Sequence, residues 1–454
     1  MVRYILIRFL FLLSLTKSNQ FINGVDISML KQVEENGGLF YEDGVQIDPI
    51  QIFKNKGINT ARIKIWHAPS LNYNNLESVL EIANRAYSVG LDLFLDFHYS
   101  DSWADPSSQS KPLAWVDLNF ETLCDSIEQY SRHVITKLKN QNTLPKYVQI
   151  GNETDCGLLW PDGYVCDESD NEFQWNKLRS LFMHAIEGVN SALDTQDTIE
   201  IISHVSSGGN WFFSNLLETG IDIDILSISY YPMWHGALND LNNNIDALGN
   251  QFQKPILIAE TAYPFTLQWN DNTNNILGFE TQILEDYEAT EEGQFLFLRD
   301  LITLVSENDY GLGICYWAPD WISTNQFGSP WENQTLFDFD GELLDAISVF
   351  DNSNAEIKSV NNFRLNNIYN YPNPFNPITN LRYDLSEDAF VRITVFDILG
   401  NIVKKFPNTN QYSGSKLVQW DARNNQGESV SAGVYIYKIQ AGDLSQTKKM
   451  ILLK

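Results

Sequence analysis

The stretch TARIKIWHAPSLNYNNLESVLEIANRAYSVGLDLFLDFH, residues 60–98, decides the fold. Two runs rich in β-branched and aromatic residues, 60–66 and 91–98, read as strands. Between them, residues 76–90 carry apolar side chains every three or four positions and end at a glycine, which indicates an amphipathic helix. The stretch therefore predicts one strand–helix–strand unit.

The same alternation continues along most of the chain. Six further strand-like runs are NGVDIS (23–28), YVQIGNE (147–153), IEIISHV (199–205), ILSISYYP (225–232), PILIAETAYP (255–264) and GLGICYWAP (311–319). Eight strands separated by helix-like segments over about 330 residues predict an α/β fold, a (β/α)8 TIM barrel. A doubly wound open sheet is the alternative, but no glycine-rich phosphate loop follows the first strand.

Composition and the N-terminus bear on location and partners. The chain has 454 residues, 43% of them apolar, and a net charge of -28, which argues against nucleic acid or an anionic membrane surface as partner. Residues 1–20 combine early arginines with a short apolar run, the pattern of a secretory signal peptide. Cys156 and Cys166 lie ten positions apart in a predicted loop and could form a local disulfide in an oxidising compartment.

The composition and periodicity of the sequence change after the eighth strand. We expect the barrel to span residues 21–352 and a linker to span 353–377, where the run IYNYPNPFNPITN is rich in proline and asparagine. Short alternating strands follow, which predict a small all-β, Ig-like sandwich over residues 378–454.

In a (β/α)8 barrel, active sites lie at the carboxyl ends of the strands. The predicted rim residues that could bind a substrate are Asp26, Arg62, His98, Asn152, His204, Tyr230 and Trp317, joined by Trp331 from the loop that follows. Tryptophan rings offer flat apolar faces suited to sugar rings. We therefore expect a lined cleft that binds a polysaccharide.

Two rim carboxyls suggest the chemistry. Glu153 follows the fourth strand and Glu260 the seventh, so the two side chains can converge across the barrel mouth. Two carboxyls roughly 5 Å apart are the geometry of a retaining glycosidase, in which one is the nucleophile and the other the acid and base. Asn152 could hold a sugar hydroxyl, Arg62 could keep the nucleophile ionised, and Tyr230 could donate to the same carboxylate.

The segments GVDISMLKQVEENGG, ARIKIWHAP, LDFHYSDSWADPSSQSKPLAW, VQIGNETDCGLLWP, SISYYPMWHGALNDL, ETAYPFTL and SPWENQTLFDFDG together resemble the endo-β-1,4-galactanases of glycoside hydrolase family 53. The resemblance implies hydrolysis of β-1,4-galactan in type I arabinogalactan and pectin with retention of configuration. It also implies that Glu153 is the acid and base and Glu260 the nucleophile.

The resemblance carries further expectations. No cofactor is required, but some bacterial members carry a structural calcium in the loop after the seventh strand, where Asp271 is the candidate ligand. The tail resembles the sorting domains of type IX secretion substrates, which implies the type IX machinery as partner and a secreted or cell-surface location. A carbohydrate-binding module is the alternative for the tail, and we expect a monomer. The alternatives for the barrel are an endo-glycanase for mannan or cellulose and an inactive glycan-binding protein.

Overall fold

The computed structural model of the protein describes residues 20–166, 172–218, 220–351, 365–385, 388–441 and 444–453. Nearly all of the predicted signal peptide and the first part of the predicted linker lie outside these residues. The chain divides into two compact units, Met1–Asp351 and Asn352–Lys454.

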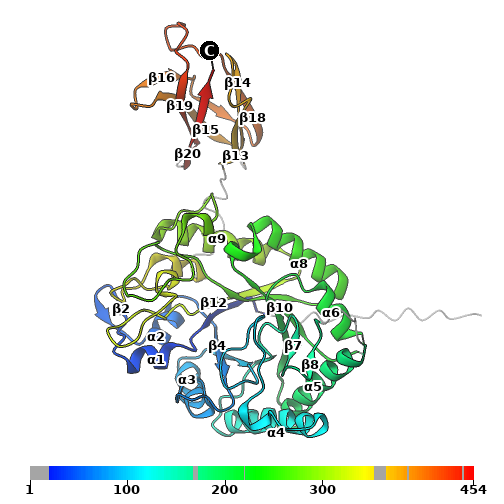
Figure 1. Ribbon diagram of the computed structural model, residues 1–454. Coiled ribbons are helices and arrows are strands. Elements are labelled where there is room, and N and C mark those ends of the chain that lie inside the picture. The colour runs from blue at the N-terminus through cyan, green and yellow to red at the C-terminus, as the bar shows by residue number, and fades with distance from the viewer. Residues whose placement is uncertain are drawn as a thin grey trace, which may run out of the picture. The chain divides into compact units, whose positions relative to one another are not determined.

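The first unit contains a closed barrel of eight parallel strands, which confirms the predicted fold (Figure 1). Around the barrel the order is β1-β12-β11-β10-β9-β6-β5-β4. Their bounds are β1 (Ile22–Asp26), β4 (Thr60–Ile65), β5 (Asp92–Phe97), β6 (Tyr147–Ile150), β9 (Glu200–Val205), β10 (Ile225–Tyr230), β11 (Ile256–Thr261) and β12 (Gly311–Trp317).

Helices surround the strands, as Figure 1 shows. They are α1 (Leu30–Glu35), α2 (Pro49–Asn55), α3 (Leu76–Ser88), α4 (Phe120–Asn140), α5 (Glu172–Asn190), α6 (Asn210–Leu217), α7 (Pro232–His235), α8 (Leu238–Phe252) and α9 (Glu291–Glu307), with 3-10 turns η1 (Leu113–Trp115), η2 (Glu280–Gln282), η3 (Glu332–Gln334) and η4 (Asp345–Phe350). Helix α3 begins where the Asn75 side chain accepts a hydrogen bond from the Ser78 N–H, and its apolar face is buried.

The barrel interior is layered along its axis. One buried apolar cluster contains Phe94, Tyr147 and Ile202 from three neighbouring strands. Because side chains on one face of a strand recur every second residue, the next inward positions are Asp96, Gln149 and His204, all buried. An apolar layer therefore supports a polar layer, and the polar layer lies directly below the rim.

Strand β11 departs from this period at one point. Leu257 belongs to the interior cluster, so a regular strand would next turn Ala259 inward. The pairing register with β10 shifts there, and Ser229 pairs with Glu260. This irregularity turns Glu260 toward the barrel interior.

The loop after β6 is tied down covalently. Cys156 and Cys166 form a disulfide across the short hairpin of β7 (Gly157–Leu158) and β8 (Gly163–Tyr164). A second hairpin joins β2 (Tyr41–Glu42) to β3 (Val45–Gln46). Within the described ranges, no helix is long and apolar enough to cross a membrane.

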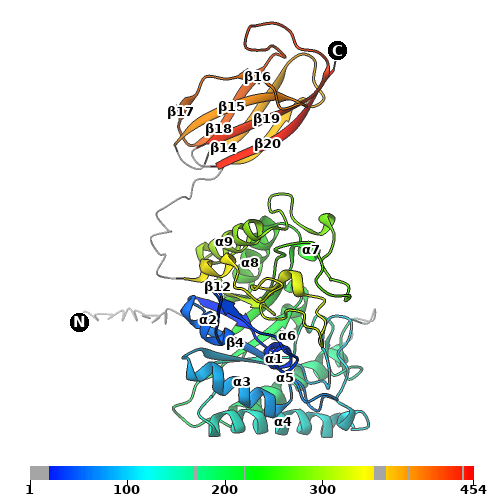
Figure 2. The ribbon, with the colours of Figure 1, turned by 90° about the vertical axis from the view of Figure 1, so that its left-hand side faces the viewer.

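The second unit is all β, as predicted (Figure 2). One sheet has the order β13-β14-β18, and the other has the order β16-β15-β19-β20 with β17 paired to β15. The bounds are β13 (Leu365–Tyr371), β14 (Thr379–Leu385), β15 (Ala389–Asp397), β16 (Ile402–Lys405), β17 (Thr409–Gln411), β18 (Gly414–Trp420), β19 (Gly433–Ala441) and β20 (Leu444–Leu452). Strand β13 corrects the predicted linker over 365–371, because these residues form a ladder with β14 instead of an extended lead-in.

Candidate active site

The end of β6 holds Glu153 in an unusual backbone conformation. Its φ of 42° is left-handed, which costs a residue with a side chain about 1–3 kcal/mol. Surrounding hydrogen bonds hold this turn: Gln109 Nε2 donates to the carbonyls of Asn152 (2.7 Å) and Glu153 (3.2 Å), and the Thr154 N–H donates to the His204 carbonyl. The strain and the clamp together fix the direction of the Glu153 side chain.

Arg62 is the centre of a buried network beneath the rim. Its guanidinium donates to Asp26 (2.7 Å), Asp96 (2.9 Å) and the Asn152 side-chain oxygen (2.9 Å), and it lies 3.0 Å from Glu260 Oε1. Only 1% of the Arg62 side chain is exposed, so these contacts are shielded from water. Glu260 is thus an ion-paired carboxylate, with the Tyr231 hydroxyl donating to its other oxygen (3.1 Å).

Glu153 has neutral partners instead. The Ser229 hydroxyl donates to Glu153 Oε1 at 2.6 Å, and His204 Nε2 lies 3.1 Å from the same hydroxyl. Because the single Ser229 proton goes to Glu153, His204 Nε2 must be the donor to Ser229. Burial and the charge of Arg62 lower the pKa of His204 well below its ordinary value, so this imidazole stays neutral.

The two carboxyls differ in their readiness to ionise. Burial raises the pKa of Glu153 well above its ordinary value, and the negative charge of Glu260 acts in the same direction. Burial also raises the pKa of Glu260, to about 7, although Arg62 opposes the rise. Since only Glu260 contacts the guanidinium, we assign the ionised form of the pair to Glu260 and the protonated form to Glu153.

Aromatic rings form a continuous row across the barrel mouth. Successive ring centroids lie 4.7–5.9 Å apart. The aromatic row, in order, is Trp66, Trp103, Trp317, Trp331, Tyr231 and Trp234. Trp66, Trp103 and Trp317 are half-buried and Trp234 is exposed, so four of the six rings present surface to a ligand. Such a row suits an extended glycan chain.

Several predicted substrate-binding residues have other contacts. Tyr230 does not reach Glu260: its hydroxyl donates to the Gly236 carbonyl, and its ring stacks on Phe297 outside the barrel. Inward positions on this segment are Ser229 and Tyr231, so the alternation of side chains excludes Tyr230. The prediction for Tyr230 is therefore wrong, and Tyr231 makes the contact.

Five further residues that are predicted to bind substrate have exposed fractions of 0–3%; these residues are Asp26, Arg62, His98, His204 and Trp331. Each of them contacts other protein groups. His98 Nδ1 accepts from the Trp66 indole N–H and the Ala104 N–H, and its Nε2 faces Asp96. Their roles in substrate binding stay predictions, and their burial favours positioning of other side chains.

Five residues near the two carboxyls are not among the predicted site residues. Asp96, Gln149, Ser229, Tyr231 and Lys64 all lie in or beside the polar layer. Lys64 Nζ lies 4.1 Å from the centroid of the Trp103 ring, and burial lowers the pKa of Lys64 to about 8. Polar residues two apart on one strand, such as 62 with 64 and 96 with 98, were the available signal.

The proposed calcium ligand, Asp271, already accepts two backbone hydrogen bonds. The Asp271 carboxyl accepts hydrogen bonds from the Thr273 and Ser329 N–H groups. The described part of the chain has no group of three His, Cys, Asp or Glu residues that could hold a metal ion. A single carboxylate already serving two N–H donors does not fit a calcium site, and we derive no role for the ion.

The barrel, the two rim carboxyls and the aromatic row are typical of a glycoside hydrolase. The family follows from residues 22–350, which match Glycosyl hydrolase family 53, and the chain belongs to this family. Residues 369–453 match the Secretion system C-terminal sorting domain, so the protein is secreted and located at the cell surface.

Individual relatives agree with this family. The chain is 39% identical to an uncharacterised protein in the bgaB 5' region of Niallia circulans, over 73% of this chain and 94% of that protein. It is 34% identical to the arabinogalactan endo-beta-1,4-galactanase of Cellvibrio japonicus, over 70% and 86%. Among solved structures, the Ignisphaera aggregans GH53 catalytic domain has 36% identity and a TM-score of 0.68, covering 73% of this chain and 95% of that one.

Proposed function

We propose that the protein is an endo-β-1,4-galactanase that hydrolyses internal bonds of type I arabinogalactan and pectic galactan with retention of configuration. The observation that supports this proposal most strongly is the contrast between the two carboxyls: Glu260 is ion-paired with Arg62, whereas Glu153 is bonded to the Ser229 hydroxyl and burial raises its pKa. The names of the relatives supply the substrate, since the Cellvibrio protein is called an arabinogalactan endo-beta-1,4-galactanase.

The first step forms a bond between Glu260 and the sugar. The Glu260 carboxylate attacks the anomeric carbon, the glycosidic C–O bond breaks, and the Glu153 proton passes to the leaving oxygen. Arg62 and Tyr231 keep Glu260 ionised and oriented before the attack. Asn152 Nδ2 donates one hydrogen to the Ala104 carbonyl at 2.9 Å, which leaves its second hydrogen for a sugar hydroxyl.

The second step releases the sugar. Glu153, now a carboxylate, takes a proton from water, the water oxygen attacks the anomeric carbon, and the Glu260 carboxylate leaves. Two displacements at the same carbon restore its configuration. The exposed members of the aromatic row bind the chain on both sides of the reacting bond, which favours cleavage within a polymer. The sorting domain directs export through the type IX machinery.

Product analysis tests the proposal. The purified protein is incubated with β-1,4-galactan, mannan and cellulose, with the double variant E153A/E260A as control. We expect galactan alone to be shortened into oligosaccharides, and NMR to show the β-anomer as the first product. Cleavage of mannan or cellulose instead of galactan would contradict the substrate, first release of the α-anomer would contradict the mechanism, and binding without products would indicate a glycan-binding protein.

A further inference from the structure

The turn that presents Glu153 lies next to a disulfide-closed hairpin. Only two residues separate Glu153 from Cys156 along the chain. The disulfide between Cys156 and Cys166 spans the β7–β8 hairpin, whose strands have two residues each. Short two-stranded hairpins are marginally stable in water. The covalent link therefore closes a hairpin that its own strands hold only weakly.

The closed hairpin holds the loop after β5 in place. The Trp160 N–H donates to the Gln109 carbonyl at 2.8 Å, and Trp160 pairs with Ser110 as a parallel bridge. Trp160 lies inside the disulfide loop, and its indole N–H donates to the Cys156 carbonyl at 3.0 Å. The disulfide thus restrains the stretch of main chain that binds Gln109.

Gln109 carries this restraint back to the acid. It is 2% exposed, and its Nε2 donates to the carbonyls of Asn152 and Glu153. Because the φ of Glu153 is left-handed, these hydrogen bonds help to offset the strain of the turn. The contacts form a closed ring that runs from Glu153 through the hairpin to Gln109 and back to Glu153.

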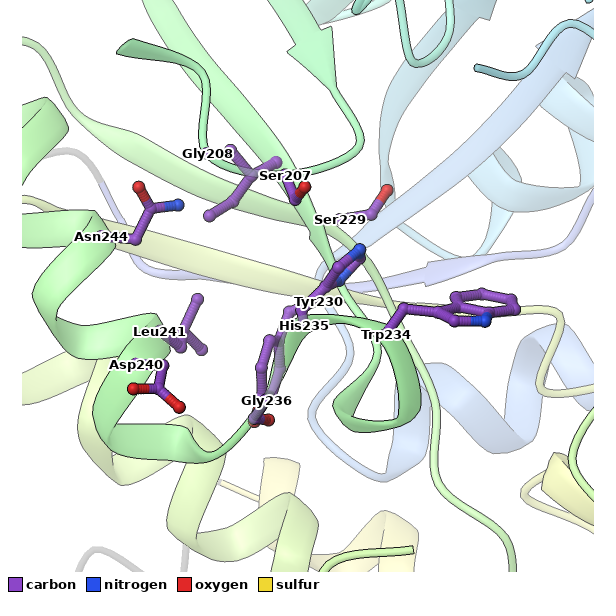
Figure 3. A pocket seen from close by; sticks show the side chains of 11 residues that line it. Ser207, Gly208, Ser229, Tyr230, Trp234, His235, Gly236, Asp240, Leu241 and Asn244 are labelled. Atoms are coloured by element: carbon purple, nitrogen blue, oxygen red, sulfur yellow. The ribbon is translucent and has the colours of Figure 1, made fainter. Parts of the chain in front are cut away.

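Packing on the other side of the acid leaves room for movement. Glu153 is bonded to the Ser229 hydroxyl, and Ser229 lies at the edge of a cavity of about 360 Å³ (Figure 3). Ser207 and Gly208 from the loop after β9 line the same cavity. Since a cavity provides no packing contacts, the position of the acid depends on its own turn and on Gln109.

The nucleophile has a separate set of contacts. Glu260 lies on β11 and is held by Arg62 and Tyr231. Within the described part of the chain, no hydrogen bond or ion pair joins residues 156–166 to any of these three side chains. Opening of the hairpin should therefore displace the acid and leave the nucleophile in place.

We propose that the Cys156–Cys166 disulfide positions the Glu153 carboxyl, through Gln109, for proton transfer to the leaving group. The proposal rests on the proposed function, because Glu153 must be the acid. The two cysteines and Gln109 are positioning residues, since none of them contacts the reacting atoms. When the disulfide is open, the strained turn relaxes, and a displacement of about 1 Å is enough to lower a rate about 100-fold. Acid catalysis in this chain therefore requires that both thiols are oxidised.

The first test compares two substrates for the full-length protein. C156S/C166S should lower kcat/KM about 10- to 100-fold on galactan, because the proton donor is displaced. On an aryl galactoside, whose leaving group needs no proton, the same variant should stay within about 2-fold of the wild type. A disulfide that only stabilises the fold would not distinguish the substrates. An unchanged kcat/KM on galactan, or an equal loss on both substrates, would overturn the proposal.

Reduction of the wild type provides an independent measurement. Dithiothreitol gives two electrons and two protons to the S–S bond, which breaks into two thiols, while the reagent closes into a cyclic disulfide. Cys166 is exposed, so the reagent can reach the bond. The reduced wild type should behave like C156S/C166S, on which the reagent should have no effect, since Cys124 and Cys315 are already free. Full activity on galactan after reduction, with the new thiols counted by alkylation, would overturn the proposal.

The route through Gln109 is tested by a third variant. Q109M keeps the approximate size of the side chain and removes its N–H donors, so it should reproduce the selective loss on galactan. Combined with C156S/C166S, it should add little further loss, because both changes open the same ring of contacts. Losses that multiply in the combined variant would show that the disulfide does not act through Gln109.

D162N is the matched control within the same hairpin. Asp162 pairs with Lys111 and Lys177, and its replacement removes these ion pairs while the disulfide and the Trp160–Gln109 hydrogen bond stay in place. Partly exposed pairs contribute little, so D162N should match the wild type on both substrates. A selective loss in D162N equal to that in C156S/C166S would assign the effect to general loosening of the hairpin and overturn the proposal.

The proposed function is tested separately in the same assay. If E153A loses equally on both substrates, Glu153 is not the acid, and the proposed function fails. If E153A is selective and C156S/C166S is not, only the role of the disulfide fails. If the wild type cleaves another glycan instead of galactan, the same ratios are measured on that glycan. Thermal unfolding shows whether C156S/C166S is folded, and reduction of the folded wild type takes its place if it is not.

Discussion

Glu153 and Glu260 are the same residue type at equivalent ends of two barrel strands, yet their surroundings differ in kind. Glu260 contacts a buried cation, Arg62, and a phenol hydroxyl. Glu153 contacts a serine hydroxyl that is held by a neutral imidazole. One environment stabilises a carboxylate, and the other tolerates a protonated acid.

The backbone that presents each carboxyl differs as well. Glu260 reaches the interior through an irregularity in the pairing of β10 with β11. Glu153 reaches it through a left-handed turn clamped by Gln109. Roles in this pair are therefore set by partners and local backbone geometry, and each prediction below removes one of these differences.

Removal of the carboxyls has the largest expected effect. E260A should lose at least about 10⁴-fold in kcat/KM on every substrate, because no other group can form the covalent bond. E153A should lose about 10²- to 10⁴-fold on galactan but far less on an aryl galactoside, whose leaving group needs no proton. Steady-state kinetics on both substrates checks this. An equal loss for E153A on both substrates would contradict its role as acid.

Removal of the Arg62 guanidinium has the second-largest expected effect. R62M should leave Asp26, Asp96 and Glu260 buried without their partner, which costs about 3–5 kcal/mol of unfolding free energy and most of the activity. The matched control is R85M, since the Arg85 side chain is 27% exposed where it pairs with Glu34 and such pairs contribute at most about 1 kcal/mol. Chemical denaturation compares the two, and equal costs would contradict the central role of Arg62.

The sequence alone was sufficient to predict the overall fold and the proposed carboxyl pair. All eight barrel strands were predicted within a few residues because strand and helix periodicities differ clearly, as in residues 60–98. Glu153 and Glu260 were singled out because they end strands. Strand β13 was missed because its three asparagines and the prolines that follow it are typical of loops, although its backbone pairs with β14.

The side chains that contact the two carboxyls could be identified only from the structure. Tyr230 and Tyr231 are chemically identical, and only the inward direction of Ser229 shows which one faces Glu260. Likewise, the burial of Asp26 and His204 favours a role in positioning other side chains over direct contact with substrate, and burial depends on how distant strands pack. The end of a strand can be predicted from the local sequence. Where the pairing of a strand is irregular, the local sequence does not show which face of the strand a residue lies on.

The two carboxyls should set the two limbs of the pH profile. The active form has Glu260 ionised and Glu153 protonated, so kcat/KM should fall as pH drops below about 7, where Glu260 gains a proton, and again above the raised pKa of Glu153. Both limbs should lie above those of ordinary carboxyls. On an aryl galactoside, E153Q should keep the acid limb and lose the alkaline one. An alkaline limb that survives in E153Q would belong to another group.

Loss of the Ser229 hydroxyl has the smallest expected effect. S229A removes the hydrogen bond that lowers the pKa of Glu153, so the alkaline limb should move to higher pH. The acid also loses its orienting donor, and kcat/KM on galactan should fall about 3- to 10-fold. The other groups that act on this carboxyl, Glu260, Asp155 and Arg62, stay in place, so the shift reports Ser229 alone.

Ser227 provides the matched control for this last comparison. It lies two residues earlier on β10, is equally buried, and donates to the Ser203 carbonyl. S227A should therefore lose a hydrogen bond of the same kind without any shift of the alkaline limb, whereas S229T, which keeps a hydroxyl, should restore the limb. If S227A and S229A shift the limb equally, the effect is a general loosening of β10, and Ser229 does not set the proton affinity of Glu153.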